Sequence, residues 1–209
     1  MSSAGETKAT PESAPESLES ETAALGARIR RLRTGRGLSL KELSVKAGLS
    51  LGLLSQIERG TSSPSLRTLT KLRLALEVPL SALFPAVEGQ VADSRWIRRQ
   101  EDRARIDLGP SRFVKELLSP DGSRPLQLLL LTLPPGGGSG AEPYSYEGEK
   151  AGLVLNGGCR LRVGDEAIDL RKGDSFQFDS SIPHSFENPH RTEAKLLWII
   201  SKPPSPAEI

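Results

Sequence analysis

The chain has 209 residues, of which 36% are hydrophobic and 26% charged, and its 28 basic and 26 acidic side chains give a formal net charge of +2. This composition indicates one large or two small globular domains and excludes a membrane protein, because the longest apolar run, Leu126 to Leu133, is too short to span a bilayer. The single cysteine, Cys159, and an acidic N-terminus that lacks the apolar segment of a targeting signal lead us to expect a cytoplasmic protein.

The net charge is unevenly distributed along the chain. Residues 1–24 carry a net charge of −4, residues 25–90 carry +7 and residues 91–209 carry −1. A basic segment beside a nearly neutral one is typical of a phosphate-binding module joined to a second domain, although a solvated helical face would give the same charge.

The N-terminal segment is acidic, rich in Ser, Glu, Pro, Ala and Thr, and nearly free of large apolar side chains. Such a segment cannot bury enough surface to offset its chain entropy. We therefore predict a disordered acidic tail over residues 1–23.

Apolar spacing becomes helical over residues 24–84 and predicts a compact all-α domain of about five short helices, the last of them opening at Pro79. Ser39 and Glu42 have the spacing of a capping box at the start of the second helix. The three-residue joint Gly48-Leu49-Ser50 between the second and third helices is the signature of a helix-turn-helix.

The run LSLKELSVKAGLSLGLLSQIERGTSSPSLRTLTKLRLALEVPLSALF strongly resembles the DNA-binding domain of the Xre family of phage-repressor-like regulators. The resemblance implies that the helix from Ser50 to Arg59 is a recognition helix in the major groove of double-stranded DNA. The positions that map onto base-reading residues are Leu51, Gly52, Ser55 and Gln56. Only Ser55 and Gln56 can hydrogen-bond a base edge, so we expect sparse direct readout.

Basic and hydroxyl side chains around this helix are candidates for contact with DNA phosphates, which set affinity and register without reading sequence. Each of them could also be an ordinary surface residue. The candidates are Arg28, Arg36, Lys41, Arg59, Ser62, Ser63 and Arg67.

The second half of the chain has strand-like alternation and predicts an all-β domain over residues 105–202, followed by a tail over residues 203–209. Residues 85–110 read as a connector in which Trp96 and Ile97 would begin the first strand. A hairpin with a buried face is predicted around the Gly164-Asp165 turn. Short strands with regular turns favour a sandwich or a barrel.

The run EPYSYEGEKAGLVLNGGCRLRVGDEAIDLRKGDSFQFDSSIPHSFEN resembles a cupin, a small double-sheet barrel. The combination resembles the Xre-cupin class of regulators and implies an α+β chain of two domains, an all-α helix-turn-helix domain and an all-β cupin barrel. In metal-binding cupins, two His, one Glu and a further His hold a divalent ion; the corresponding residues here are Tyr144, Tyr146, Lys150 and His184.

This ligand set is poor for iron, manganese or zinc, because it offers one imidazole, two phenols of high pKa and an ammonium that repels a cation. We therefore expect no metal, no cofactor and no catalytic residue. The alternative is a metal-dependent cupin oxygenase or epoxidase-like enzyme that carries a helix-turn-helix domain.

The barrel would then hold a small-molecule effector, for which six residues are candidate pocket residues: Tyr144, Tyr146, Lys150, His184, Phe186 and Asn188. Core packing of the tyrosines, a backbone-bonded His184 in a turn, and pairing of Lys150 with a nearby glutamate are the alternatives. An inward Lys150 would complement an anionic group and would disfavour a polycation.

Together these patterns predict a homodimeric, sequence-specific DNA-binding regulator in which an effector bound by the cupin changes the affinity for DNA through the connector. A third possibility is that the cupin only dimerises the protein and binds no effector.

Overall fold

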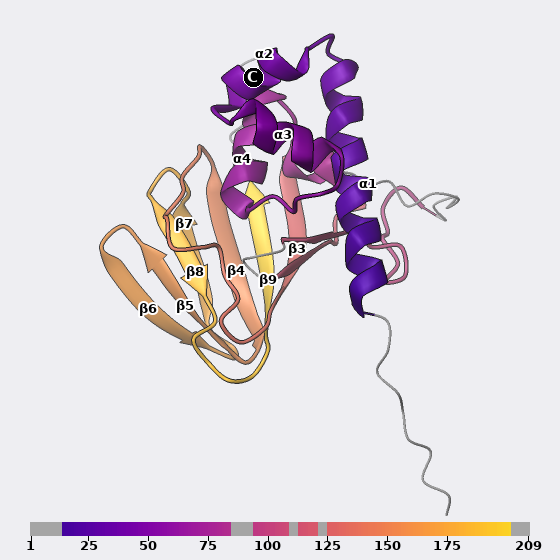
Figure 1. The fold of residues 1–209 in the computed structure, drawn as a ribbon. Helices are drawn as coiled ribbons and strands as arrows, with labels where there is room; N and C mark the ends of the chain where they lie inside the picture. Colours follow the sequence, from indigo (N-terminus) through magenta and orange to yellow (C-terminus); the bar gives the residue numbers. More distant parts are fainter. Residues whose placement is uncertain (1–13, 85–93, 109–112, 121–124, 202–209) are drawn as a thin grey trace, which may run out of the picture.

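The computed structural model describes residues 14–84, 94–108, 113–120 and 125–201 of the chain. In these ranges the helical elements are α1 (Ala14–Thr34), α2 (Leu40–Ala47), α3 (Leu51–Glu58), α4 (Leu66–Ala75) and the 3-10 helix η1 (Leu80–Leu83). The strands are β1 (Arg105–Asp107), β2 (Val114–Leu117), β3 (Leu126–Leu133), β4 (Glu149–Asn156), β5 (Gly158–Val163), β6 (Glu166–Arg171), β7 (Ser175–Asp179), β8 (His184–Glu187) and β9 (Ala194–Ser201). The helices gather over one end of the strands, as Figure 1 shows, and the predicted two-part α+β architecture is confirmed.

The predicted number of about five helices is corrected to four α-helices and one 3-10 turn within the described residues. The segment after Pro79 is only four residues long, and its backbone bonds join residues three apart, such as Ala82 N–H to the Pro79 carbonyl at 3.0 Å. A segment this short cannot build the i to i−4 ladder of an α-helix.

The predicted disordered tail is wrong for residues 14–23, which form the first part of α1; residues 1–13 lie outside the described residues. Helix α1 contacts β1 of the barrel, a partner that the composition of the tail could not reveal. Burial against this region raises the pKa of Glu21, and the nearby Arg105 partly opposes that shift.

Serine caps fix the start of α2, α3 and α4, and the one at Ser39 is part of the predicted capping box. The side chains of Ser39, Ser50 and Ser65 each accept a hydrogen bond from the backbone N–H three residues on, at 3.2 Å. The Glu42 carboxylate accepts from the Ser39 N–H at 2.7 Å and completes the capping box. Gly48, with φ of 59°, takes the left-handed conformation that ends α2 and opens the turn to α3.

A bidentate ion pair between Arg33 and Glu58 holds helix α3 against α1. Arg33 donates to both carboxylate oxygens of Glu58, at 2.7 and 2.8 Å, and also to the Leu38 carbonyl at 2.8 Å. Both charged side chains are largely buried, with 11% and 6% of their surface exposed. This pair fixes the orientation of the helix that resembles the recognition helix.

The strands form two antiparallel sheets, one with the order β1-β2-β3-β9-β4-β7 and one with the order β6-β5-β8. The predicted β5–β6 hairpin forms around Gly164, whose φ is 57°. Its buried face is smaller than expected, because Ile168 is 41% exposed and only Leu170 of β6 is buried.

The predicted start of the first strand is also wrong. Trp96 and Ile97 are exposed residues of a turn, and the first strand is β1, in which Ile106 is the buried residue. No helix in the described part of the chain is both long and apolar enough to cross a bilayer.

The helical domain rests directly on the barrel, and their buried residues form one continuous hydrophobic core. The Gln127 amide of β3 donates to Ser81 Oγ of η1 at 3.0 Å and accepts from the Ser81 N–H at 3.3 Å. On other parts of the junction, Ser63 Oγ donates to the Asp107 carbonyl at 3.2 Å, and Arg67 pairs with Glu142. Two of these contacts, Gln127 to Ser81 and Arg67 to Glu142, therefore join the domains without involving the connector.

We expect Glu58→Gln to lower the free energy of unfolding by about 2–4 kcal/mol, because it leaves the buried Arg33 guanidinium without its counter-charge. Urea denaturation measures the change. Lys46→Met is the matched control, since it breaks the exposed pair of Lys46 and Glu77 and should cost less than about 1 kcal/mol. Equal effects of the two substitutions would show that the buried pair does not anchor α3.

Candidate functional site

The outer face of α3 carries the four residues predicted to read bases. Leu51 is 48% exposed, Gly52 and Gln56 are exposed, and Ser55 is half-buried, whereas Leu54 and Ile57 are in the core. A Cβ built on Gly52 would meet no atom within 4 Å, so the backbone here is open to close approach. The helix therefore presents a small surface of one amide, one hydroxyl and one apolar side chain.

The predicted phosphate-contacting residues divide into two groups. Arg36, Lys41 and Arg59 are exposed, and Ser62 is half-buried in the loop after α3. The other three make contacts within the protein: Arg28 donates through Nε to the Ala82 carbonyl at 2.8 Å, and Ser63 and Arg67 make the junction contacts to the barrel given above.

Inside the barrel, Lys150 of β4 points inward and is 1% exposed. Its ammonium donates to the Tyr144 hydroxyl at 3.0 Å and is hydrogen-bonded to Nε2 of His184 on β8. It also lies 4.3 Å from the Tyr144 ring centroid and 4.6 Å from that of Tyr146. The sequence left open whether Lys150 pairs with a nearby glutamate or points inward. In the structure it points inward, and its ammonium bonds to a phenol and an imidazole.

His184 is held in a neutral form that accepts a hydrogen bond from Lys150. Its Nδ1 lies 2.7 Å from the Ile182 carbonyl, which makes Nδ1 the donor and leaves Nε2 as an acceptor. Burial, with the neighbouring charge of Lys150, lowers the pKa of His184 to about 4, so the imidazole is uncharged at neutral pH.

Two of the six predicted pocket residues do not join this cluster. Phe186 packs edge-on against Phe113, with ring centroids 5.3 Å apart. The Asn188 amide donates to the carbonyls of Leu133 and Thr192, at 2.9 and 2.8 Å. Phe186 is therefore in the barrel core and Asn188 fixes a turn, while Tyr144, Tyr146, Lys150 and His184 lie together.

These residues do not fit a divalent metal ion. The imidazole nitrogen that would face such an ion is hydrogen-bonded to a cationic side chain, and burial raises the pKa of both Tyr144 and Tyr146, which disfavours phenolate ligands. No group of three or more His, Cys, Asp or Glu side chains suited to a metal occurs in the described residues.

Two further buried cations lie near the cluster and were not predicted from the sequence: Arg73 of α4 and Lys115 of β2. They are 5% and 4% exposed, and the Arg73 guanidinium stacks 4.3 Å from the centroid of the Tyr146 ring. A signal was present in both cases. Arg73 follows Leu69 by one helical turn on the apolar face of α4. Lys115 stands two residues from both Phe113 and Leu117, on the same buried face of its strand.

Three buried basic side chains gather here, and no carboxylate pairs with them among the described residues. Burial, and to a smaller extent the charge of Arg73, lowers the pKa of Lys115 to about 7. Burial, then Lys115 and Arg73, lowers the pKa of Lys150 well below its usual value. Such shifts indicate cations that would gain from a bound anion.

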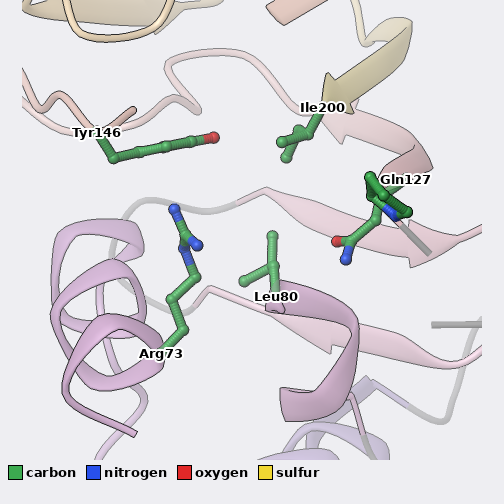
Figure 2. A pocket seen from close by; sticks show the side chains of 6 residues that line it. Arg73, Leu80, Gln127, Tyr146 and Ile200 are labelled. Atoms are coloured by element: carbon green, nitrogen blue, oxygen red, sulfur yellow. The ribbon is translucent and has the colours of Figure 1, made fainter. Parts of the chain in front are cut away.

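A cavity opens beside this group at the junction of the two domains, as Figure 2 shows. The space between its walls is small, with room for about one water, and it opens into a wider volume of about 230 Å³ that includes solvent. Its lining residues come from α4, η1, the barrel strands and a barrel loop: Arg73, Leu80, Pro125, Gln127, Tyr146 and Ile200.

Comparison with known families and proteins gives consistent matches for both parts of the chain. A helix-turn-helix family model matches residues 29–83, and a cupin domain model matches residues 129–200. The HTH-type transcriptional regulator PuuR of Escherichia coli is 30% identical over 185 residues, which cover 88% of this chain and 96% of PuuR. The regulator SutR of the same species is 26% identical, over 78% of this chain and 86% of SutR.

A solved structure has a similar arrangement over most of its length. The crystal structure of an HTH_3 family transcriptional regulator from Vibrio cholerae matches with a TM-score of 0.67 and 26% identity, over 90% of this chain and 99% of that one.

We expect Lys115→Met to raise the free energy of unfolding by about 1–3 kcal/mol at pH 7, because it removes a buried cation in exchange for an apolar side chain of similar length. The folded-state pKa of Lys115, about 7, is below its ordinary value of 10.5. The unfolded chain therefore binds more protons between these values, and the stability of the wild type should rise with pH across this window. Urea denaturation from pH 7 to 10 should show a shallower rise for the variant.

The matched control for Lys115→Met is Lys195→Met, at a half-exposed lysine of β9 that pairs with Glu193. Its effect should stay within about 0.5 kcal/mol. A loss of stability in Lys115→Met would mean that the ammonium has favourable interactions which outweigh its burial.

Proposed function

Because this chain belongs to the Xre-type helix-turn-helix transcription regulators that carry a cupin domain, we propose that it binds a specific operator through α3 and that an anionic small molecule bound in the barrel changes that affinity. The protein would act in the cytoplasm, where its operator DNA lies. The observation that carries the effector part is the buried ammonium of Lys150, set among aromatic rings and a neutral imidazole inside the barrel.

An ammonium in such surroundings is costly, because burial penalises its charge and neither Tyr144 nor His184 carries a negative charge to offset it. An anionic ligand would supply that charge. The cluster of Tyr144, Tyr146, Lys150 and His184 is therefore the effector site we propose, and its chemistry disfavours polyamines.

We also propose that the protein is not an enzyme. A cupin oxygenase needs a metal held by imidazole and carboxylate side chains, and Lys150 stands where the carboxylate would be. The hydrogen bond between Lys150 and His184 further opposes metal binding at the one retained imidazole.

A homodimer is the expected assembly. One short helix reads only a few base pairs, so two copies placed about one helical turn apart on DNA are the usual way to reach specificity. The barrel offers exposed apolar residues for such an interface, including Leu155 and Ile168, which are 42% and 41% exposed. If the cupin only dimerises the chain, no small molecule will change DNA affinity.

Fluorescence anisotropy of the full chain on its own promoter DNA and on scrambled DNA, over a range of salt concentrations, tests this function. We expect tighter, salt-sensitive binding to the promoter, and a change of about 5- to 150-fold when an anionic effector is added. Specific binding that no compound alters would favour the dimerising cupin. Absence of specific binding would reject the proposal that the protein recognises an operator in this promoter.

Within this function, Gln56→Ala should relax sequence preference by about 1–3 kcal/mol at one base pair, since Gln56 is the exposed amide of α3 that can hydrogen-bond a base edge. Anisotropy on a set of singly substituted operators measures it. Lys41→Met is the comparison: a phosphate contact would weaken all sequences alike and reduce the salt dependence. Uniform weakening by Gln56→Ala would instead mean that Gln56 only positions the helix.

A further inference from the structure

We propose that the effector site is shared between the two domains, with Arg73 of α4 as a direct ligand of a short-chain carboxylate bound in the cavity lined by Arg73, Tyr146 and Gln127. The inference rests on the proposed function and names the residue through which the effector acts on the DNA-binding domain.

Arg73 is a buried cation that lacks a counter-charge. It is 5% exposed, and among the described residues no carboxylate or other acceptor pairs with its guanidinium, which is stacked on the Tyr146 ring. A guanidinium has five N–H donors in a flat fork that matches a carboxylate bidentately. A carboxylate in the adjacent cavity would satisfy donors that the protein leaves open.

Two neutral side chains can complete the hydrogen bonding of such a ligand. Burial raises the pKa of Tyr146, so its hydroxyl stays protonated and can donate. Gln127 is held by its two bonds to Ser81, which fix the plane of its amide, and its second N–H can donate to a ligand. Both residues line the cavity together with Arg73 (Figure 2).

Positive charge inside the barrel adds to the attraction for an anion. The Lys150 ammonium lies 4.6 Å from the centroid of the same Tyr146 ring, and Arg73 is close enough to lower the pKa of both Lys115 and Lys150. No ion pair joins Arg73, Lys115 or Lys150 to a carboxylate in the part of the chain that the structure describes. The three cations would share one ligand charge.

The cavity also limits the size and character of the ligand. The space between the side chains has room for about one water, and the wider 230 Å³ includes open solvent, so only the carboxylate group fits inside and the rest of a short ligand extends toward solvent. Leu80, Pro125 and Ile200 form apolar walls beside the polar groups. A carboxylate with a short hydrocarbon chain matches both features better than an inorganic oxyanion does.

A ligand on Arg73 acts on the helix-turn-helix without passing through the connector. Arg73 belongs to α4, which packs against α2, the helix that precedes the recognition helix. Binding would therefore change the position of α4 over the barrel. A ligand that contacts Arg73 in only one of these positions binds the two states unequally, which coupling requires.

The test measures binding of a four-carbon series to the full-length protein by isothermal titration calorimetry, and its effect on promoter affinity by anisotropy. The series is succinate, butyrate, butyramide and 1,4-diaminobutane, so that charge varies while length stays constant; inorganic phosphate is included as a compact anion. We expect one of the two carboxylates to bind and shift promoter affinity, and the amide, the diamine and phosphate to bind at least tenfold more weakly.

In Arg73→Met, we expect the affinity for the carboxylate to fall by about 10- to 100-fold and its effect on promoter binding to be lost. Arg73→Lys, which keeps the charge and loses the fork, should retain part of the affinity. Lys71→Met is the matched control on the same helix: it removes a surface hydrogen bond to the Gly48 carbonyl and should leave carboxylate affinity within about twofold. Circular dichroism and melting curves verify that each variant is folded.

The outcomes separate the inference from the proposed function. If the wild type responds to a carboxylate and Arg73→Met responds equally, the proposed function stands and the shared site is wrong. If the wild type responds only to phosphate or to the diamine, the carboxylate assignment is wrong. If no compound of the series binds the wild type or changes its promoter affinity, both the anionic effector and the shared site are rejected.

Discussion

Uncompensated positive charge at the end of the barrel is the constraint on which the rest of the structure depends. Three cations are buried there: Lys150 of β4 and Arg73 of α4 lie over the Tyr146 ring, and Lys115 of β2 lies 5.6 Å from the Phe113 ring centroid. Apolar side chains at these positions would stabilise the protein more. Cations retained at this cost are consistent with the anionic effector proposed above, which would bind where the two domains touch.

The same charges separate this barrel from a metal enzyme of equal shape. Here Tyr144 and Tyr146 lie in the loop before β4, Lys150 on β4 and His184 on β8, and the bridge between Tyr144 and His184 brings the loop against β8. One lysine among the four would turn a cation site into an anion site, because it is hydrogen-bonded to the imidazole and its charge would repel a metal ion. The cupin fold is the same in both cases, and the side chains at these four positions decide which ligand it can bind.

Much of the architecture follows from local signals in the sequence. The Ser39–Glu42 capping box, the Gly48 turn and the alternation around the Gly164-Asp165 turn each predict their elements, because backbone bonding and burial act over a few residues. Long-range packing accounts for the errors: α1 begins earlier because β1 supports it, and Trp96 lies outside any strand despite its apolar character. In the candidate site, Lys150 and His184 were predicted through resemblance, whereas Arg73 was overlooked among the other basic residues of its helix.

The continuous core between helices and barrel limits how freely the two halves can be exchanged with those of other regulators. A chimera that joins this barrel to a foreign helix-turn-helix domain would need a partner for Gln127 in place of Ser81, and a flat cation in place of Arg73 to cover Tyr146. Without them, apolar surface and polar groups at the junction would be exposed or unpaired. Functional sensor swapping therefore requires transplanting the surface of α4 and η1 along with the barrel, because the boundary of the interchangeable unit does not coincide with the connector.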